Sequence, residues 1–245
     1  MSGVDTAYAA GFVDREAARV NSPPFFGGRG AVSTASPRGT VSEAFDRLLA
    51  EVSACTVCAP HLPRGPRPVL RGLPSARLLI ISQAPGTRVH ETGLSFDDRS
   101  GDRLREWLGL DRAIFYDESR VAIMPIGLCY PGRDIRGGDL PPRRECAPRW
   151  HTPLRAVFPA IELTLLVGSY AIYYYLPHKR RHSMTETVAH WRDVLPEYFV
   201  LPHPSWHTIR WLRDNSWFEK EVLPELRSRI GAVLGTTAAA SILQP

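Results

Sequence analysis

The fold is decided by residues 77–86, which read RLLIISQAPG. Leu78 to Ile81 form an unbroken apolar run whose length suits a strand better than a helix. The run stops at a turn that contains Pro85 and Gly86. A buried strand followed at once by a polar turn is typical of a parallel sheet whose strand ends line a ligand site.

A second stretch has the same form far along the chain. The apolar residues 198–201 are followed by the turn Pro202-His203-Pro204-Ser205. The two prolines restrict the backbone on either side of His203. Because the carboxyl ends of parallel strands lie at one edge of a sheet, we expect the two turns to face each other.

Strands and helices alternate along the chain. The pattern predicts strands at 78–82, 121–125, 162–167 and 198–201, and helices at 41–54, 100–110, 143–158, 168–176, 184–193 and 216–233. Ser42 is the expected N-cap of the first helix, and residues 87–98 are expected to form a polar loop. The alternation predicts an α/β fold with three α/β/α layers and a central, four-stranded, mostly parallel sheet.

Composition sets the domain organisation that we expect. The 245 residues carry a formal net charge of +5, a mild basic excess that nucleic-acid binding would explain but does not require. Residues 1–40 and 236–245 are expected to be flexible tails around a domain at 41–235. No apolar run reaches the roughly 20 residues of a membrane span, and no secretion signal is recognisable, so we expect a cytoplasmic protein.

The two turns, with Gly93, Phe96, Gly101 and Leu104 at their spacing after the first, resemble the uracil-DNA glycosylase superfamily. The resemblance covers roughly residues 45–230. It is closest to the bacterial iron–sulfur branch (family 4-like) and to the divergent Bradyrhizobium-type branch. It implies a DNA-repair enzyme that flips uracil out of DNA, hydrolyses its N-glycosidic bond and leaves an abasic site.

The resemblance also implies roles for particular residues. His203 would donate a hydrogen bond to the uracil O2, and Phe96 would stack on the base. Alternatively, His203 could be a capping or core histidine, and Phe96 could be an ordinary core aromatic residue. Ala84, Pro85 and Gly86 would form a wall of the base pocket, and Gln83 would orient a water.

Two positions depart from the superfamily pattern. Ala84 stands where other branches carry a carboxylate or an amide. We therefore expect His90 and Glu91 to take over the role of that missing side chain. Asp97 and Asp98 are weaker substitutes, and His90 and Glu91 could equally serve as a hydrogen-bonded loop brace. Pro125 stands where an asparagine usually reads the base, so the backbone of Pro125, Ile126 and Gly127, or a side chain elsewhere, is expected to read it. The base could therefore also be hypoxanthine or xanthine.

The segment after the His203 turn would contact DNA. Ser205, Trp206, His207 and Arg210 are the candidate residues, with the two rings as wedges and the arginine on phosphate. Trp206 could instead be a core residue. Uracil-containing DNA, single- or double-stranded, is the expected partner of a monomeric protein that also binds the abasic product.

The chain has four cysteines, Cys55, Cys58, Cys129 and Cys146. Two residues separate the first pair, 70 lie before the third cysteine and 16 before the fourth. In a reducing compartment such thiols suggest a metal site rather than disulfides. The spacing resembles the [4Fe-4S] ligands of the same bacterial branch; zinc, or no metal at all, stays possible.

The expected activity is monofunctional, because neither signature turn contains a lysine for lyase chemistry. An alternative is a protein on the same scaffold that binds uracil or abasic DNA without turnover. A small-molecule or nucleotide hydrolase is less well supported, because the chain has neither a Gly-x-Ser-x-Gly elbow nor a Walker-type phosphate loop.

Overall fold

A computed structural model describes residues 40–135, 137–179, 181–205 and 208–236. The two predicted tails lie outside these ranges, apart from residues 40 and 236, so they stay predictions. None of the helices in the described part of the chain combines the length and apolar content that a bilayer crossing requires.

Four strands form one sheet. They are β1 (Leu78–Ile81), β2 (Val121–Ile123), β3 (Leu163–Val167) and β4 (Tyr198–Leu201), in the order β2-β1-β3-β4. Every neighbouring pair is parallel. The apolar run that begins at Leu78 forms one of the two central strands, and all four of its residues are buried. The predicted α/β fold with a parallel sheet is confirmed.

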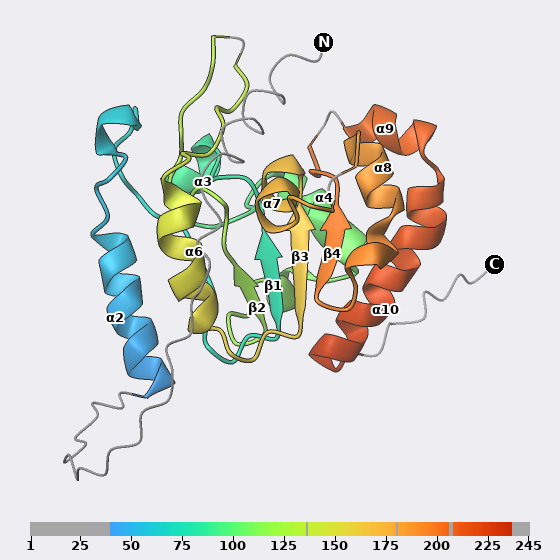
Figure 1. Cartoon of the computed structure of the whole chain (residues 1–245), viewed down its shortest axis with the longest axis horizontal. Helices are drawn as coiled ribbons and strands as arrows, with labels where there is room; N and C mark the ends of the chain where they lie inside the picture. Colours follow the sequence, from blue (N-terminus) through green and yellow to red (C-terminus); the bar gives the residue numbers. More distant parts are fainter. Residues whose placement is uncertain (1–39, 136, 180, 206–207, 237–245) are drawn as a thin grey trace, which may run out of the picture. The chain divides into compact units, whose positions relative to one another are not determined.

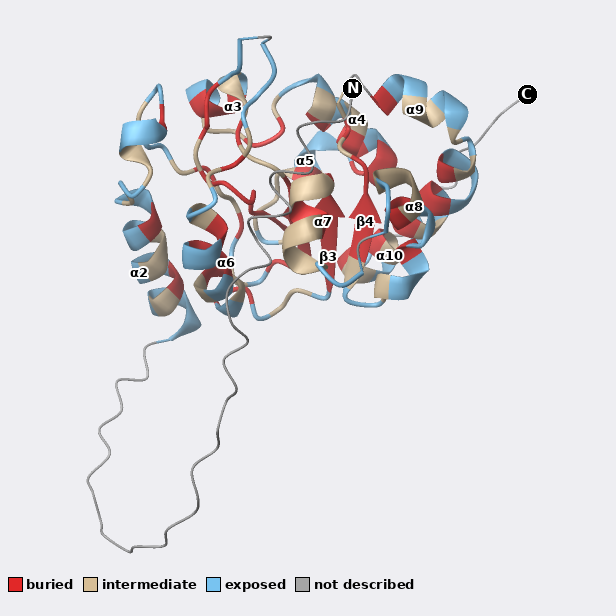
Figure 2. Cartoon of the chain, turned by 45° about the horizontal axis from the view of Figure 1, so that its top comes forward, coloured by how far each residue is buried: buried red, intermediate tan, exposed pale blue. Residues whose placement is uncertain are grey.

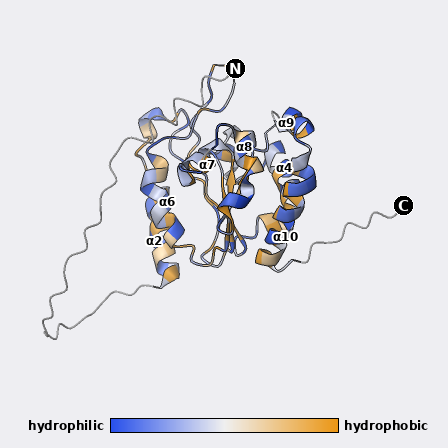
Figure 3. Cartoon of the chain, turned by 45° about the vertical axis from the view of Figure 1, so that its right-hand side comes forward, coloured by the Kyte–Doolittle hydropathy of each residue, from blue (hydrophilic) through white to orange (hydrophobic). Residues whose placement is uncertain are grey.

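Helices cover both faces of the sheet, as Figures 1 and 3 show. On one side α4 (Arg99–Leu108) packs against α10 (Leu223–Leu234), and on the other α2 (Val41–Ser53) packs against α6 (Cys146–Ala156). In Figure 2 the strands are buried while the outer faces of the helices are exposed. The remaining helical segments are α3 (Thr87–Thr92), α5 (Arg112–Phe115), α7 (Ser169–Tyr175), α8 (Met184–Ala189), α9 (Thr208–Asp214) and the short turns η1 (Ala59–His61), η2 (Trp191–Val194) and η3 (Phe218–Val222).

Several local predictions were wrong. The N-cap of α2 is Thr40 instead of Ser42, because Thr40 and Glu43 form a reciprocal capping box. The first half of the expected polar loop is the helix α3, which begins at the β1 turn and ends at Gly93 in the left-handed conformation, φ 75°. The expected C-terminal helix is divided, because the π-helical turn η3 precedes α10 and places Pro224 in the first turn of α10.

Pairing continues past the strand ends and builds the rim of the sheet. Beyond β2, the Ile126 amide donates to the Ser82 carbonyl and the Gly127 amide donates to the Gln83 carbonyl, both at 2.9 Å. The Gly168 amide, after β3, donates to the Leu201 carbonyl at 2.9 Å. The backbone at this rim is therefore fixed by hydrogen bonds between segments far apart in sequence.

Candidate active site

A pocket of about 480 Å³ opens at the carboxyl ends of the strands. The pocket is lined by Ser82, Ala84, Pro85, Gly86, Val89, Ser95, Phe96, Asp98, Ser100, Pro125, Asp139 and His203. The turn after β1 and the turn after β4 thus face the same space, as the sequence predicts.

His203 is held at this pocket by its backbone and its neighbours. Its carbonyl accepts a hydrogen bond from Thr208 Oγ1 at 2.5 Å, and Arg103 of α4 donates to the carbonyls of Pro204 and Ser205. Gly168, with φ 87°, packs against it, and a Cβ added there would lie 3.2 Å from the His203 Cβ. Burial lowers the pKa of His203, and the smaller effect of the Asp98 charge opposes this. His203 is therefore a neutral hydrogen-bond donor at pH 7.

Phe96 lines the pocket in a strained backbone conformation. Its φ of 57° is unusual for a bulky residue. Its carbonyl accepts hydrogen bonds from Arg105 at 3.2 Å and from the Tyr116 hydroxyl at 3.0 Å. Its ring packs edge-on against Phe115, 6.1 Å away. Strain that the surroundings hold in place is frequent at binding sites, which supports Phe96 as a base platform.

Gly101 makes this conformation possible, and its replacement by alanine tests it. A Cβ at Gly101 would lie 1.8 Å from the Phe96 carbonyl oxygen. Gly→Ala within a helix normally stabilises by up to about 1 kcal/mol. For Gly101→Ala we expect the opposite sign: the free energy of unfolding should fall by about 2 kcal/mol or more, because the Phe96 backbone must move. Urea unfolding measures this change, and an unchanged or raised midpoint would contradict the strained geometry.

Three predicted catalytic residues do not line the pocket. The Gln83 carbonyl accepts from Gly127. His90 is buried against the Tyr130 ring, and burial, followed by the charges of Arg67 and Arg64, lowers its pKa. Glu91 is exposed and pairs with Arg64 at 2.5 Å.

The contacts of His90 and Glu91 match the brace alternative. Arg67 donates to both of their carbonyls at the end of α3, and Arg64 holds the Glu91 carboxylate. Both residues therefore lie on the side of α3 that contacts the segment before β1, because a helix directs only part of its surface to the pocket.

The pocket contains polar groups that sequence reasoning missed. Asp98 is a weaker candidate than His90 on sequence grounds, and Ser82, Ser95, Ser100 and Asp139 line the pocket without a sequence signal for that role. Asp139 belongs to the loop between β2 and α6, more than 50 residues beyond the first turn. Its irregular Gly- and Pro-rich sequence has no period from which a side-chain direction could be predicted.

The backbone donors expected to read the base are already engaged. The amides of Ile126 and Gly127 donate to Ser82 and Gln83, Pro125 has no N–H, and only Pro125 of the three lines the pocket. The amides of Ile126 and Gly127 are therefore not free to read a base, and reading by the backbone of residues 125–127 stays a prediction that depends on carbonyl oxygens. Among the described residues that line the pocket, the polar groups available to a ligand are the serine hydroxyls, the two carboxylates, the His203 ring and carbonyl oxygens.

His151 lies beneath this wall, fully buried in α6. Its Nε2 lies 3.1 Å from the Pro125 carbonyl and its Nδ1 lies 2.7 Å from the Tyr175 hydroxyl. A carbonyl only accepts, so the ring carries its proton on Nε2 and Tyr175 donates to Nδ1. Burial lowers the pKa of His151 to about 4, so the ring is neutral at pH 7.

This burial predicts a pH-dependent stability. The folded pKa of about 4 lies below the ordinary 6.5, so the unfolded chain binds the extra proton between these values. Stability from His151 is complete above pH 6.5 and is lost as pH falls to 4, by about 3 kcal/mol. The variant His151→Gln keeps a donor and an acceptor but cannot take up this proton. We therefore expect its free energy of unfolding, measured in urea, to fall less than that of the wild type between pH 6.5 and pH 4. Parallel pH curves for the two proteins would contradict this role.

The predicted DNA-contacting residues are only partly within the described ranges. Trp206 and His207 lie outside them, so their roles stay predictions. Ser205 is half-buried at the pocket turn. Arg210 on α9 has 83% of its side chain exposed and lies 3.8 Å from Asp214. This weak, exposed ion pair leaves the Arg210 guanidinium accessible to a phosphate.

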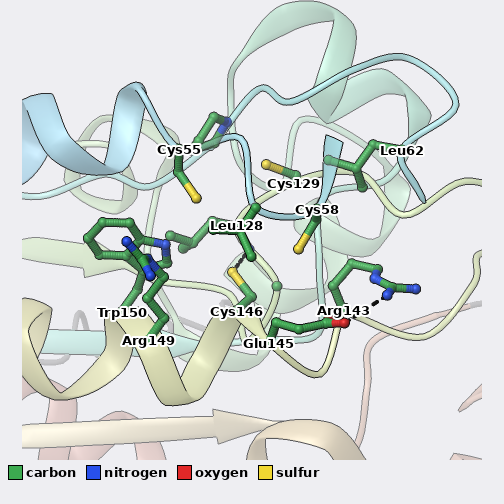
Figure 4. A pocket seen from close by; sticks show the side chains of 13 residues that line it. Cys55, Cys58, Leu62, Leu128, Cys129, Arg143, Glu145, Cys146, Arg149 and Trp150 are labelled. Carbon is green, nitrogen blue, oxygen red and sulfur yellow. Dashed lines mark hydrogen bonds and ion pairs between the residues drawn. The ribbon is translucent and has the colours of Figure 1, made fainter. Parts of the chain in front are cut away.

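A second pocket collects all four cysteines (Figure 4). Cys55 follows α2, Cys58 precedes η1, Cys129 follows β2 and Cys146 begins α6. All four are free thiols, and Figure 4 shows their sulfur atoms around a common space. Leu62, Leu128 and Trp150 are among the apolar residues that line it.

The electrostatics of this pocket disfavour unliganded thiolates. Burial raises the pKa of Cys129 to about 11 and that of Cys146 to about 12. Backbone amides partly offset this, because Leu128 donates to the Cys146 sulfur at 3.3 Å and Arg67 donates to the Cys129 sulfur. Amide donors of this kind tune cysteine-bound metal centres. Within the described ranges, no three His, Cys, Asp or Glu side chains form a ready site for a metal ion.

A family comparison agrees with the geometry. Residues 71–227, well over half of the chain, match the uracil DNA glycosylase superfamily. The matched range contains both pocket turns, Phe96 and two of the four cysteines. The chain therefore belongs to the uracil DNA glycosylase superfamily, whose members bind DNA and hydrolyse N-glycosidic bonds in it.

Proposed function

We propose that the protein is a monofunctional uracil-DNA glycosylase. The observation that supports this best is that His203, at the end of β4, and Phe96, in the segment after β1, line one pocket. A flipped base enters such a pocket, stacks on an aromatic ring and is read by hydrogen bonds.

The bond to be broken joins the deoxyribose C1′ to N1 of uracil. As it breaks, positive charge develops on the sugar and negative charge on the base. A neutral imidazole N–H placed at the uracil O2 stabilises that negative charge without reorganisation. Neither turn contains a lysine, so no covalent sugar adduct, and hence no strand cleavage, is expected.

An excision assay tests the proposal. Purified protein is incubated with single- and double-stranded oligonucleotides that contain one uracil. We expect free uracil and an abasic strand that is cut only after alkali treatment. Intact substrate that is bound in a gel shift but never hydrolysed would instead favour the binding-protein alternative, and absence of both binding and release would end the proposal.

A wider base range is a second candidate, and the pocket lining favours it. No side-chain amide is among the described residues that line the pocket, whereas the hydroxyls of Ser82, Ser95 and Ser100 are. A hydroxyl can donate or accept, so it does not select one pattern of base edge. Oligonucleotides with hypoxanthine or xanthine in the same assay distinguish a uracil-specific enzyme from one for deaminated bases in general.

We further propose that the four cysteines hold a [4Fe-4S] cluster, as in the family 4-like branch. Four thiols in one pocket with apolar walls, two of them accepting backbone amide hydrogen bonds, fit the donor set of such a cluster. When bound, the cluster would supply structural cross-links. It would join the end of α2 to the loop after β2 and to the start of α6.

The DNA would lie across the end of the sheet where the pocket opens. The exposed guanidinium groups of Arg210 and Arg213 on α9 follow the His203 turn directly. Phosphate contacts there would position a flipped nucleotide at His203. We expect this monomeric enzyme to work in the cytoplasm on chromosomal DNA.

A further inference from the structure

We propose that Asp139 is the catalytic carboxylate that activates the hydrolytic water, in the absence of an acidic side chain at Ala84. This inference rests on the glycosylase function proposed above. It follows from the geometry of the loop between β2 and α6, which brings a carboxylate to the rim of the pocket from outside both signature turns.

The Asp139 carboxylate lies directly against the first turn. Its Oδ2 is 3.4 Å from the position that a Cβ on Gly86 would occupy. Gly86 and Ala84 both line the pocket, as does Asp139 itself. The hydrogen side chain of Gly86 leaves this approach open, so the carboxylate faces the space beside Ala84 where a catalytic group is otherwise lacking.

A short hairpin holds the backbone of Asp139 at the pocket rim. Arg133 and Asp139 form an antiparallel bridge, and the Leu140 amide donates to the Gly132 carbonyl at 2.9 Å. Arg133 Nε lies 3.6 Å from Asp139 Oδ1. One carboxylate oxygen thus faces the arginine, while the other faces Gly86 and the pocket.

The other nearby carboxylates are engaged elsewhere. Asp97 contacts two arginines, Arg88 and Arg112. Asp98 lines the pocket, but its Oδ1 caps α4 by accepting from the Gly101 amide at 2.9 Å and from the Ser100 hydroxyl at 2.5 Å. Asp139 is therefore the pocket carboxylate that no helix needs as a cap.

The charges around Asp139 suit a base. Burial and the charge of Asp98 raise its pKa, while Arg133 lowers it. His203 also lines this space, and it is neutral there. A carboxylate with a pKa above the ordinary value is a stronger proton acceptor.

The reaction step balances as follows. The water oxygen forms a bond to C1′ while the C1′–N1 bond breaks. The electron pair of that bond leaves with the base, where His203 stabilises it through O2. The water proton passes to the Asp139 carboxylate. The products are an abasic sugar with a new hydroxyl at C1′, the base as its anion and a protonated Asp139. Transfer of this proton to the base through solvent gives the neutral free base and restores the carboxylate.

Asp139→Asn, assayed for base release in single turnover, tests the proposal. We expect kcat to fall about 100-fold or more, because a general base typically contributes 10²- to 10⁴-fold. KM should change by only a few-fold, because the amide keeps the size of the side chain. Asp111→Asn is the matched control. Asp111 is an exposed N-cap of α5 far from the pocket lining, and asparagine caps equally well.

A second variant separates catalysis from a structural role. Arg133→Gln removes the charge that lowers the Asp139 pKa, so the acidic limb of the rate–pH profile should move to higher pH. Asp139→Asn should abolish that limb. If Asp139 had only a structural role, neither Arg133→Gln nor Asp139→Asn would change the shape of the rate–pH profile.

The outcomes are distinct. Wild-type rates in Asp139→Asn, or an acidic limb unmoved by Arg133→Gln, would overturn the role of Asp139 while the glycosylase function stands. A wild-type protein that releases no base from any substrate would overturn the proposed function, and this role with it.

Discussion

His203→Ala is expected to slow base release by about 100- to 1,000-fold. This is the usual cost of removing one preorganised donor to a developing negative charge. The imidazole is half-buried in the pocket, and burial lowers its pKa, so it acts as a neutral donor. Because the charge on the base develops only as the bond breaks, we expect the loss in kcat, with DNA binding preserved. Single-turnover excision beside a gel shift measures both quantities.

Two other histidine variants make this result interpretable. His190→Ala is the matched control, because His190 is exposed and contacts the backbone of its own helix. His90→Ala distinguishes between the sequence-based catalytic assignment of His90 and its role as a brace. A loss equal to that of His203→Ala would restore the catalytic assignment. A full rate in His203→Ala, with an unchanged melting temperature, would contradict the donor role of His203.

Loss of one cysteine ligand is expected to have the largest effect on stability. Cys146→Ala should lower the iron content and reduce the melting temperature by roughly 10 °C, because a structural metal site contributes several kcal/mol and a domain of this size loses about 2–4 °C per kcal/mol. The cross-link would join the first residue of α6 to the end of α2. Without it, α2 is held by contacts such as the Phe45 ring against Phe158, just after α6, at 5.7 Å.

Iron and sulfide analysis, visible absorbance and thermal melts test this prediction. Thr56→Ala is the control, because Thr56 lies between Cys55 and Cys58, is exposed and offers no thiol. Removal of the metal with a chelator should reproduce the melting temperature of Cys146→Ala. Zinc in place of iron would support the same cross-link with a different metal. Equal melting temperatures for all forms would contradict a structural metal at these cysteines.

The sequence predicted most of the architecture because the signals were local. Apolar runs such as Leu78–Ile81 are compatible only with buried strands, and their alternation with helical patterns leaves few topologies. The short helix α3 was missed because six residues are too few to show a period. The capping box at Thr40 outcompeted Ser42 because it satisfies two backbone N–H donors, those of Thr40 and Glu43, at once.

For the site, the residues that follow directly from a strand end were predicted correctly to meet. Ala84, Pro85, Gly86 and His203 line one pocket, because parallel strands bring their carboxyl ends to one edge. His90 and Glu91 are not among the residues that line the pocket, because their direction depends on the rotation of α3 about its axis, which sequence proximity does not fix.

By itself, then, the sequence determined the parallel sheet, the two facing turns and the absence of an acidic side chain at Ala84. Only the tertiary structure decided which groups surround that position. The approach of Asp139 to Gly86 depends on a hairpin between β2 and α6, and the convergence of four cysteines depends on how α2 packs on α6. Both are contacts between segments distant in the chain. Their geometry follows from how the elements pack, and no local periodicity encodes it.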